Sequence, residues 1–213
     1  MTNTVETAPA TKGLVLHWAA RYDLLVWLLT RGRDRAFREK LTNLARLTPG
    51  ETVLDVGCGT GSLAIVASRK VGATGMVHGI DPSPAMIARA RSKATTKAGT
   101  HLHFETGVAE AIPFSDATFD VVLSTLMLHH LPRPVRQQFV REMRRVLKPT
   151  GRVLIVDFAD AQQRTGLLAH VHRHGHVDPR QIVSLLEEGG FHSIESGRVG
   201  VSSLQFVLAT VTA

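Results

Sequence analysis

An apolar strand that runs directly into a glycine-rich turn constrains the fold of this chain more than any other feature. Residues 53–56 read Val-Leu-Asp-Val, and residues 57–61 read Gly-Cys-Gly-Thr-Gly. Glycine lacks a Cβ atom, so it permits positive φ angles and lets a backbone pass close to a ligand. A helix is expected to begin at Ser62. The order of strand, glycine turn and helix is typical of the ligand-binding edge of an α/β sheet.

A carboxylate at the end of the next strand adds to this signal. Residues 76–81 read Met-Val-His-Gly-Ile-Asp, a largely apolar segment that ends on Asp81. In nucleotide-binding sheets, a carboxylate at this position accepts hydrogen bonds from the ribose hydroxyls. The two strands together predict a nucleoside cofactor.

The spacing of the glycines narrows the choice of cofactor. A dinucleotide fingerprint places glycines at the first, third and sixth positions, but the sixth position counted from Gly57 is Ser62. The sequence also has no Gly-Lys-Ser or Gly-Lys-Thr tripeptide of a phosphate-binding P-loop. The turn therefore favours a nucleoside whose tail is not a pyrophosphate, although the glycine pattern alone does not decide between cofactors.

Strand-like and helix-like segments alternate along the chain, which predicts an α/β fold with ligands at the carboxyl ends of the strands. We expect strands at 52–57, 76–81, 101–106, 119–125, 152–158, 192–200 and 204–212. We expect helices at 62–71, 84–97, 134–147 and 179–188. Pro149 and Gly151 are expected to end the third of these helices.

Five segments, in order, resemble the motifs of class I S-adenosylmethionine-dependent methyltransferases. They are residues 54–61, 80–86, 107–114, 119–124 continuing to 128–131, and 147–157. The third to fifth segments are most similar to the quinone C-methyltransferases of ubiquinone and menaquinone synthesis. The resemblance implies a single Rossmann-like, mostly parallel seven-stranded sheet with an antiparallel last strand, helices on both faces and an N-terminal helical lid.

The same resemblance implies S-adenosylmethionine as cofactor and S-adenosylhomocysteine as product. Asp81 would hold the ribose and Met86 would pack on the adenine. Asp55 and the helix start after Gly61 would hold the methionine end, since a helix N-terminus suits a carboxylate. The expected cofactor contacts are Tyr22, Asp55, Gly57, Cys58, Gly59, Gly61, Asp81, Pro82, Met86, Val108, Ala109, Glu110 and Ser124.

Val108 departs from the family pattern, in which an aspartate often accepts a hydrogen bond from the adenine amino group. Valine has no acceptor, so adenine would rest on backbone groups around Ala109, on apolar packing and on Glu110. The loss of one such bond costs roughly 0.5–1.5 kcal/mol. This departure leaves open an alternative class, a methyltransferase-fold binding or regulatory protein without turnover.

The implied chemistry is an in-line displacement at an activated methyl group, which needs no metal. His129 and His130 follow the fourth strand, where family members place residues that face the methyl group, so either histidine is a candidate to orient or deprotonate the acceptor. The alternative is that His129 packs near the cofactor and His130 is a surface residue. The histidine-rich stretch 170–176 contains Arg173 and Gly175, so we interpret it as a loop rather than a metal site.

The N-terminal segment is the best clue to the acceptor. Apolar side chains at helical spacing fill residues 14–29, and Tyr22-Asp23 matches a pair in the N-terminal helix of quinone methyltransferases. We expect a lid that lines a pocket for a small, lipophilic or aromatic acceptor; the alternative is a helix that only covers the sheet. The expected organisation is a disordered tail at 1–12, a helical cap at 13–48 and a cofactor-binding domain at 49–213.

The charge of the chain offers a weaker hint about partners. It carries 25 Lys and Arg against 18 Asp and Glu, a net charge of +7. Such a surface attracts anionic membranes or nucleic acids, but no RNA-binding module or aromatic stacking platform is visible, so an RNA methyltransferase is the more distant alternative. With one cysteine and no signal-peptide pattern, we expect a cytoplasmic protein, with a membrane-peripheral place as the alternative. The sequence leaves the oligomeric state open.

Overall fold

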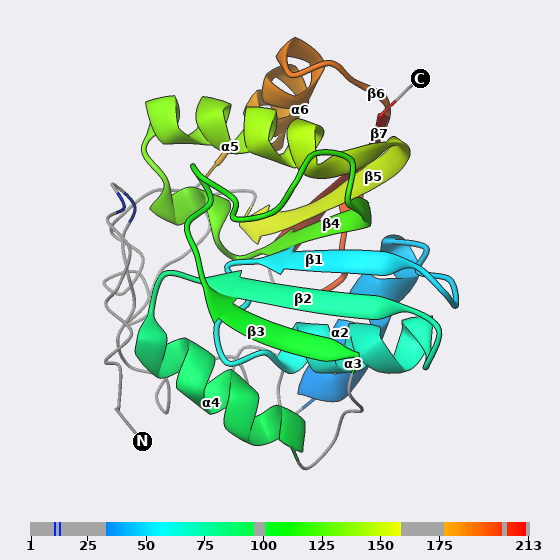
Figure 1. Ribbon diagram of the computed structural model, residues 1–213. Coiled ribbons are helices and arrows are strands. Elements are labelled where there is room, and N and C mark those ends of the chain that lie inside the picture. Colours follow the sequence, from blue (N-terminus) through cyan, green and yellow to red (C-terminus); the bar gives the residue numbers. More distant parts are fainter. Residues whose placement is uncertain are drawn as a thin grey trace, which may run out of the picture.

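The central element of the computed structural model is a seven-stranded sheet in the order β3-β2-β1-β4-β5-β7-β6 (Figure 1). The structure describes residues 11, 13, 33–95, 101–158, 177–201 and 204–211. The strands are β1 (Thr52–Val56), β2 (Met76–Asp81), β3 (Leu102–Thr106), β4 (Phe119–Thr125), β5 (Leu147–Phe158), β6 (Phe191–Arg198) and β7 (Leu204–Val211). Strand β7 pairs antiparallel with both β5 and β6, while the other strand pairs are parallel. The predicted antiparallel last strand is confirmed.

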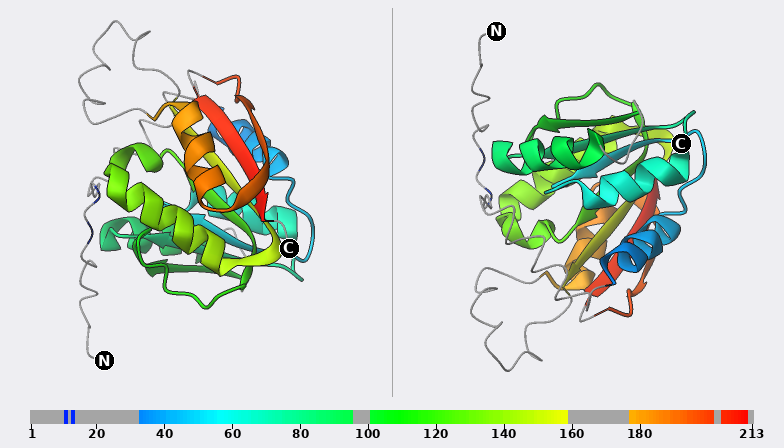
Figure 2. Two further views of the ribbon diagram at one scale, coloured as in Figure 1. Left: turned by 90° about the horizontal axis from the view of Figure 1, so that it is seen from above. Right: turned by 90° about the horizontal axis from the view of Figure 1, so that it is seen from below.

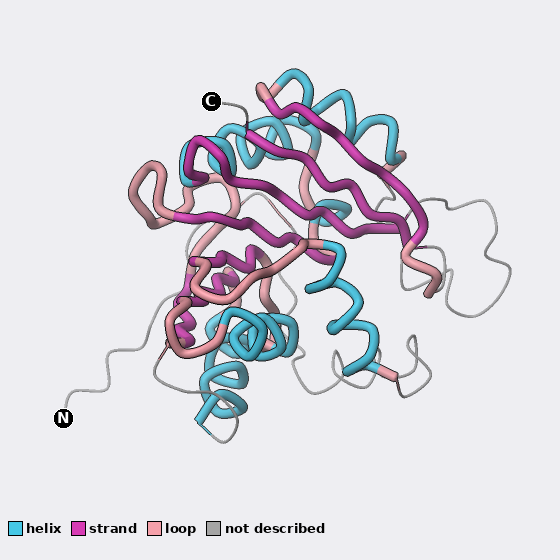
Figure 3. The backbone as a smooth tube through the Cα atoms, turned by 90° about the vertical axis from the view of Figure 1, so that its right-hand side faces the viewer, coloured by secondary structure: helices cyan, strands magenta, loops and turns pink. Residues whose placement is uncertain are grey.

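Helices cover both faces of the sheet, as predicted. They are α2 (Asp34–Leu44), α3 (Ser62–Val71), α4 (Pro84–Thr95), α5 (Arg133–Val146) and α6 (Pro179–Glu188), with a short 3-10 helix η1 (Leu128–His130). Helices α5 and α6 pack side by side on one face, while α2, α3 and α4 lie on the other (Figures 1 and 2). Figure 3 shows the strands in profile with helices on both sides.

The sheet separates two hydrophobic cores, which explains why the central strands β1 and β4 and the second half of β5 are largely apolar. In β1, Val53 faces the core under α2 and α3, whereas Leu54 and Val56 face the core under α5. Asp55 lies on the same face as Val53 because side chains alternate along a strand. A carboxyl group is thereby placed beneath α2 and α3 in an otherwise apolar layer.

The predicted boundary between α5 and β5 is wrong by five residues. The helix ends at Val146 and the strand begins at once at Leu147, whereas the sequence predicted a strand from residue 152. Leu147 pairs with Phe119 of β4, and Lys148 Nζ donates to both carboxylate oxygens of Asp120 at 2.8 Å. These contacts hold the segment in the sheet, so it continues β5 instead of forming a loop.

The segment 13–48, expected to form an N-terminal cap, lies only partly within the described residues. Helix α2 falls in this range, but residues 14–32 with the Tyr22-Asp23 pair lie outside the described residues, as do residues 159–176 with their histidine-rich stretch. In the part of the chain that the structure describes, no helix is both long and apolar enough to cross a membrane.

Candidate functional site

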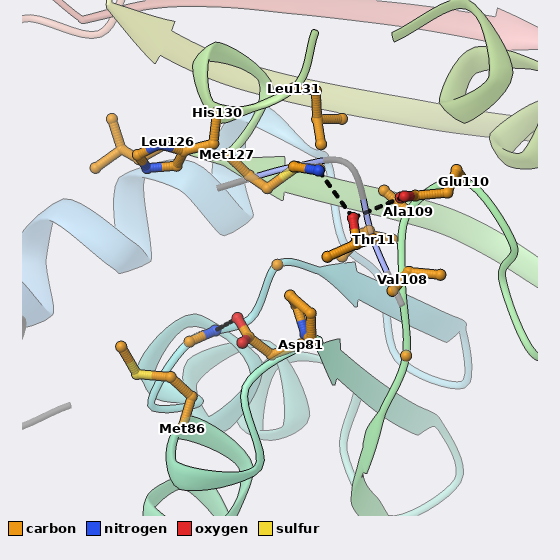
Figure 4. A pocket seen from close by; sticks show the side chains of 16 residues that line it. Thr11, Asp81, Met86, Val108, Ala109, Glu110, Leu126, Met127, His130 and Leu131 are labelled. Carbon is orange, nitrogen blue, oxygen red and sulfur yellow. Dashed lines mark hydrogen bonds between the residues drawn. The ribbon is translucent and has the colours of Figure 1, made fainter. Parts of the chain in front are cut away.

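A cavity lies at the carboxyl ends of the strands, where the chain reverses its direction of travel across the sheet. The chain runs from β1 outward to β2 and β3, then returns to place β4 on the other side of β1. In open α/β sheets this switch point is the usual place for a ligand. Sixteen of the described residues line the cavity (Figure 4). They come from the end of β1 and the glycine turn, the end of β2 and the start of α4, residues 107–110, residues 126, 127, 130 and 131 after β4, and Thr11 with Gly13.

The glycine turn owes its composition to its own backbone and packing. Gly57, Gly59 and Gly61 have φ angles of 74°, 53° and 74°, which side-chain-bearing residues rarely adopt. A Cβ atom on Gly57 would lie 2.5 Å from Cγ of Met127. One on Gly61 would lie 2.6 Å from Cζ of Phe104. The glycines are therefore required by the fold itself, before any ligand is considered.

Asp81 forms the floor of the cavity. The Gly59 N–H donates to its Oδ2 at 3.0 Å and the Ser83 N–H donates to its Oδ1 at 2.9 Å. Burial raises the pKa of Asp81, while these two hydrogen bonds act in the opposite direction. Each carboxylate oxygen has more than one acceptor site, so the group can receive two further hydroxyl donors from the cavity.

Two walls of different character face each other across the cavity. Met86, from the first turn of α4, lines the wall on the side of Asp81. Leu126, Met127 and His130 line the opposite wall, together with Leu131 (Figure 4). One wall thus offers a carboxylate and a thioether, and the other offers apolar side chains with one imidazole.

The loop after β3 meets the N-terminal segment at the mouth of the cavity. Thr11 Oγ1 donates to Glu110 Oε1 at 2.7 Å, and the Gly13 N–H donates to Thr11 Oγ1 at 3.0 Å (Figure 4). A Cβ atom on Gly13 would lie 2.9 Å from Cδ2 of Leu131, so this segment also packs against the opposite wall. Thr11 and Gly13 therefore bridge the cavity from Glu110 to Leu131, with Val108 and Ala109 beside them in the lining.

A second hollow lies on the other side of the glycine turn. It shares Gly57 and Leu126 with the first cavity and is lined in addition by Asp55, Arg38 and other side chains of α2 and α3. The Arg38 side chain is 11% exposed and is held by Asp34: its Nε donates to Asp34 Oδ2 at 3.0 Å, and its guanidinium forms an ion pair with Oδ1 at 2.9 Å. The hollow thus brings an acid and a guanidinium together.

Asp55 is the acid that lines this hollow, and its pKa is strongly raised. Asp55 is 2% exposed, and no hydrogen-bond partner for its Oδ2 is present among the described residues. Burial raises the pKa of Asp55 to about 7, against the opposing effects of Arg38 and of a hydrogen bond from the Ala64 backbone. A buried acceptor without a donor is the arrangement that a cationic ligand group satisfies.

The two adjacent histidines occupy different environments. His129 is buried and its Nδ1 lies 2.7 Å from Oδ1 of Asp157, at the end of β5. His130 lines the first cavity. Their ring centroids are 3.9 Å apart. Only the second histidine is therefore placed to meet a molecule in the cavity.

The remaining expected site residues are distributed as follows. Gly57, Gly59, Asp81, Pro82, Met86, Val108, Ala109 and Glu110 line the first cavity, and Asp55, Gly57 and Cys58 line the second hollow. Gly61, Ser124 and His129 line neither, and Tyr22 lies outside the described residues. Burial raises the pKa of the Cys58 thiol, which fits its interpretation as a small packing residue and not a nucleophile.

Sequence reasoning misses four of the residues that shape the site. Arg38 looks like one surface charge among several, and Thr11 lies in the expected tail. Asp157 is the last residue of the fifth motif, and the sequence assigns it no role. Leu126 lies between residues 119–124 and 128–131 and belongs to neither segment. Leu126 has a φ of 56°, unusual for a residue with a side chain. No sequence spacing signals these placements, because each depends on contacts between distant segments. Among the described residues there is no group of three or more potential metal ligands.

Comparisons with known proteins agree with this geometry. Residues 53–151 match a family of methyltransferase domains. The chain is 37% identical to the ubiquinone/menaquinone biosynthesis C-methyltransferase of Geobacter sulfurreducens over 68% of this chain and 57% of that protein. It is 34% identical to the demethylmenaquinone methyltransferase of Halalkalibacterium halodurans over 64% of this chain and 55% of that protein. The chain thus spans a little over half the length of these relatives.

A solved structure extends the similarity to most of the fold. An S-adenosylmethionine-dependent methyltransferase from Aquifex aeolicus superposes with a TM-score of 0.75 at 25% identity, over 91% of this chain and 98% of that one. The matched domain and the fold are those of the class I S-adenosylmethionine-dependent methyltransferases. Within that class the chain resembles the group that includes the ubiquinone and menaquinone C-methyltransferases. The cofactor of the class is S-adenosylmethionine.

Proposed function

We propose that this protein transfers the methyl group of S-adenosylmethionine to a small, apolar acceptor. The observation that carries the proposal is the pair of acids on either side of one glycine turn. Asp81 faces the first cavity with acceptor sites to spare, and Asp55 holds a buried oxygen without a donor in the second hollow. A ligand with hydroxyl donors at one end and an ammonium group at the other matches both.

The first cavity fits the adenosyl part of the cofactor. Asp81 would accept from both ribose hydroxyls while it keeps its hydrogen bonds from the glycine turn. Met86 would pack against the adenine ring. Because Val108 has no acceptor, the base would be held by the backbone around Ala109 and by packing, with Glu110 available at the edge of the ring.

The second hollow fits the methionine part. The unpaired oxygen of Asp55 would accept from the ammonium group, and Arg38 would face the carboxylate as a charge-assisted donor. Cys58, from the glycine turn, completes the lining of this hollow. The bound cofactor supplies a methyl group that is already activated by positively charged sulfur, so the protein needs to supply alignment rather than a metal.

The opposite wall fits the acceptor. Leu126, Met127 and Leu131 would exclude water and hold an apolar ring, which aligns the nucleophile for in-line displacement. Alignment of this kind contributes as much as about 7–11 kcal/mol to barrier lowering. His130 would orient the acceptor, or take its proton where the nucleophile has one to lose. His129 would act through its neighbour, since it does not line the cavity.

Residues 13–48 would close the site as a cap. Helix α2 already contributes Phe37 and Arg38 to the second hollow, and Gly13 packs against Leu131. Deletion of residues 1–30 should abolish methyl transfer to a lipophilic acceptor while part of the cofactor affinity remains. A truncated protein that still methylates such an acceptor would exclude the cap as a functional element.

We also propose a peripheral contact with anionic membranes, which would bring the protein to a lipophilic acceptor at the cytoplasmic surface. A groove between α5 and α6 is lined by Arg133, Arg136 and Arg180, and Glu188 is the one acid among the described residues that line it. Arg133 and Arg180 are exposed, whereas Arg136 is half-buried and is already under the influence of Asp157, so the first two are the charges available to an anionic surface. Nucleic acid remains the less favoured partner, for want of a stacking platform.

Binding without turnover is the second candidate function. The fold by itself does not decide, because the [4+2]-cyclase SpnF superposes with a TM-score of 0.67 at 19% identity. Val108 favours this candidate because it removes an adenine contact. Calorimetry with S-adenosylhomocysteine, followed by transfer assays with labelled S-adenosylmethionine and a panel of quinols and phenols, separates the two. Micromolar binding with transfer supports the enzyme; binding without transfer to any acceptor supports the second candidate, and no binding contradicts the cofactor site.

A further inference from the structure

We propose that Asp157 is a positioning residue of this site: through His129 it holds the turn that presents His130 to the acceptor. The inference rests on the proposed function, which places the acceptor against His130. It adds a residue that neither the motifs nor the relatives assign. Its evidence is a connected set of contacts that joins the end of β5 to the turn after β4.

A single carboxylate fixes both the backbone and the ring of His129. The His129 N–H donates to Asp157 Oδ2 at 3.1 Å, and His129 Nδ1 lies 2.7 Å from Oδ1. The side chains are only 5% and 1% exposed. The Phe158 N–H also donates to Oδ1 at 2.7 Å. Asp157 thus ties the turn to β5 through two bonds to one residue.

The contact defines the tautomer of His129. An ionised carboxylate only accepts hydrogen bonds, so the short contact requires a proton on Nδ1. In the neutral ring, the lone pair is then on Nε2. At functional sites, the hydrogen bond made by one ring nitrogen of a histidine usually sets the ring orientation and determines which nitrogen carries the proton.

His129 in turn restricts His130. The ring of His129 lies between Phe158, at a centroid distance of 5.6 Å, and His130, at 3.9 Å. The turn itself is a single 3-10 unit in which the His130 N–H donates to Met127 O at 2.9 Å. With so short a turn, a rotation of the His129 ring would displace the His130 ring that lines the cavity.

One further charged group faces this array. Arg136, on the first turns of α5, donates from Nε to Leu131 O at 2.8 Å, and the charge of Asp157 acts on it. Arg136 therefore anchors the far end of the turn, next to Leu131. Among the described residues, Asp157 and Arg136 hold the two ends of the segment that carries His130.

Nitrogen-15 NMR of the histidine rings in the wild-type protein tests the first step without any assay of methyl transfer. We expect His129 as the Nδ1–H tautomer, with a strongly deshielded Nδ1 proton. An Nε2–H tautomer of neutral His129 would overturn the proposal. This result stands even if S-adenosylhomocysteine fails to bind, so it separates the failure of this inference from the failure of the proposed function.

Asp157→Asn tests the second step, because the amide keeps the shape but has one acceptor oxygen where the carboxylate has two, so it cannot accept from both the N–H and the ring of His129. We expect kcat to fall at least tenfold, while acceptor KM and the Kd for S-adenosylhomocysteine change less than threefold. Asp120→Asn is the matched control at the opposite end of β4, where the carboxylate also accepts a backbone N–H, from Thr52. The kcat of the Asp120→Asn control should change less than twofold.

Two outcomes would contradict the positioning role. Unchanged kcat in Asp157→Asn would contradict it, as would an equal loss of cofactor affinity, which would mean that the residue only supports the fold. If Asp157→Asn does not fold, the wild-type tautomer still tests the first step, because an Nε2–H ring on neutral His129 would overturn the proposal.

Discussion

The Gly59 N–H donates to Oδ2 of Asp81 at 3.0 Å, so the end of β2 is bonded to the middle of the turn that follows β1. This bond has two consequences. It orients the carboxylate toward the cavity, and it makes the turn and the acid one unit, which a mutation in either would disturb.

Removal of the Asp81 carboxylate should be the most damaging change for cofactor binding. Asp81→Ala loses two charge-assisted bonds to the ribose, worth about 1.5 kcal/mol each, so the affinity for S-adenosylhomocysteine should fall about 100-fold in calorimetry. Asp116→Asn is the control, because that side chain is 76% exposed and pairs only with Arg145 among the described residues. An Asp81→Ala protein that binds as tightly as the wild type would exclude the ribose assignment.

The raised pKa of Asp55 should make the apoprotein less stable at neutral than at acidic pH. The pKa is about 7 in the folded state against an ordinary value of 3.8 for an aspartate in water, so the folded state binds the proton more tightly than the unfolded state. Stability from this group is therefore fully present below pH 3.8 and is lost as pH rises toward about 7. At about 1.4 kcal/mol for each pKa unit, the loss amounts to about 4 kcal/mol.

Urea unfolding at pH 5 and pH 8 measures this effect. The difference in unfolding free energy between wild type and Asp55→Asn should change by about 2–3 kcal/mol between the two pH values, because the amide does not titrate and about two pKa units of the shift lie between pH 5 and the folded-state pKa. If the unfolding free energies of the two proteins change equally between pH 5 and pH 8, Asp55 is ionised in both the folded and the unfolded state.

Ionisation of Asp55 should also govern recognition of the methionine end. A ligand ammonium group favours the charged carboxylate, so the affinity for S-adenosylhomocysteine should rise between pH 6 and pH 8, through the pKa of about 7. Methylthioadenosine has no ammonium group and should show no such rise. Arg38→Gln should weaken S-adenosylhomocysteine about 10-fold, the loss of one bond to a charged group, with little effect on methylthioadenosine. Equal pH profiles for the two ligands would place the methionine end elsewhere.

Substitution by alanine should destabilise the protein more at Gly57 than at a glycine that has a similar positive φ angle but no atoms close to its Cβ position. Both Gly57 and Gly190 have positive φ, 74° and 79°, but a Cβ on Gly190 meets nothing within 4 Å. Gly190→Ala should lose about 1–2 kcal/mol of stability, from φ strain alone. Gly57→Ala should lose more stability, because its Cβ would contact Met127. The double variant Gly57→Ala with Met127→Ala should recover part of the lost stability. Thermal unfolding measures all four proteins; equal losses at the two glycines would contradict the close contact.

The groove between α5 and α6 should contribute to binding of anionic vesicles. Arg133→Gln with Arg180→Gln removes two charges, each worth about 1 kcal/mol near such a surface, so partitioning into phosphatidylglycerol vesicles should weaken about 30-fold. Arg69→Gln with Lys70→Gln removes the same charge from α3, on the other face of the sheet, and serves as control. Equal effects of the two pairs would mean that net charge alone drives the contact.

Local patterns in the sequence are sufficient for the fold and for half of the site. The glycine turn and Asp81 belong to continuous strand-turn segments, so their positions follow from the order of strands in any sheet of this type. The start of β5 at Leu147 does not follow, because it depends on pairing with Phe119 and on the Lys148–Asp120 ion pair, while Pro149 locally favours a break.

The other half of the site depends on contacts between segments that are distant in the chain. Thr11 reaches Glu110 across 99 positions, and His129 reaches Asp157 across 28. Arg38 resembles several surface arginines in its sequence context, yet Asp34 holds it against the second hollow. Periodicity and motif spacing carry no information about such pairs, since it is tertiary packing that brings them together.

The reversal of strand order between β1 and β4 gives the protein two independently variable halves. The groups that we assign to the cofactor sit on the loops after β1, β2 and β3 and on α2 and α4, whereas those that we assign to the acceptor sit on the segment after β4. Substitutions confined to residues 126–131, whether in evolution or in a mutant library, can therefore change the acceptor preference while cofactor binding is retained. Such modularity would make this scaffold a practical starting point for retargeted alkylation.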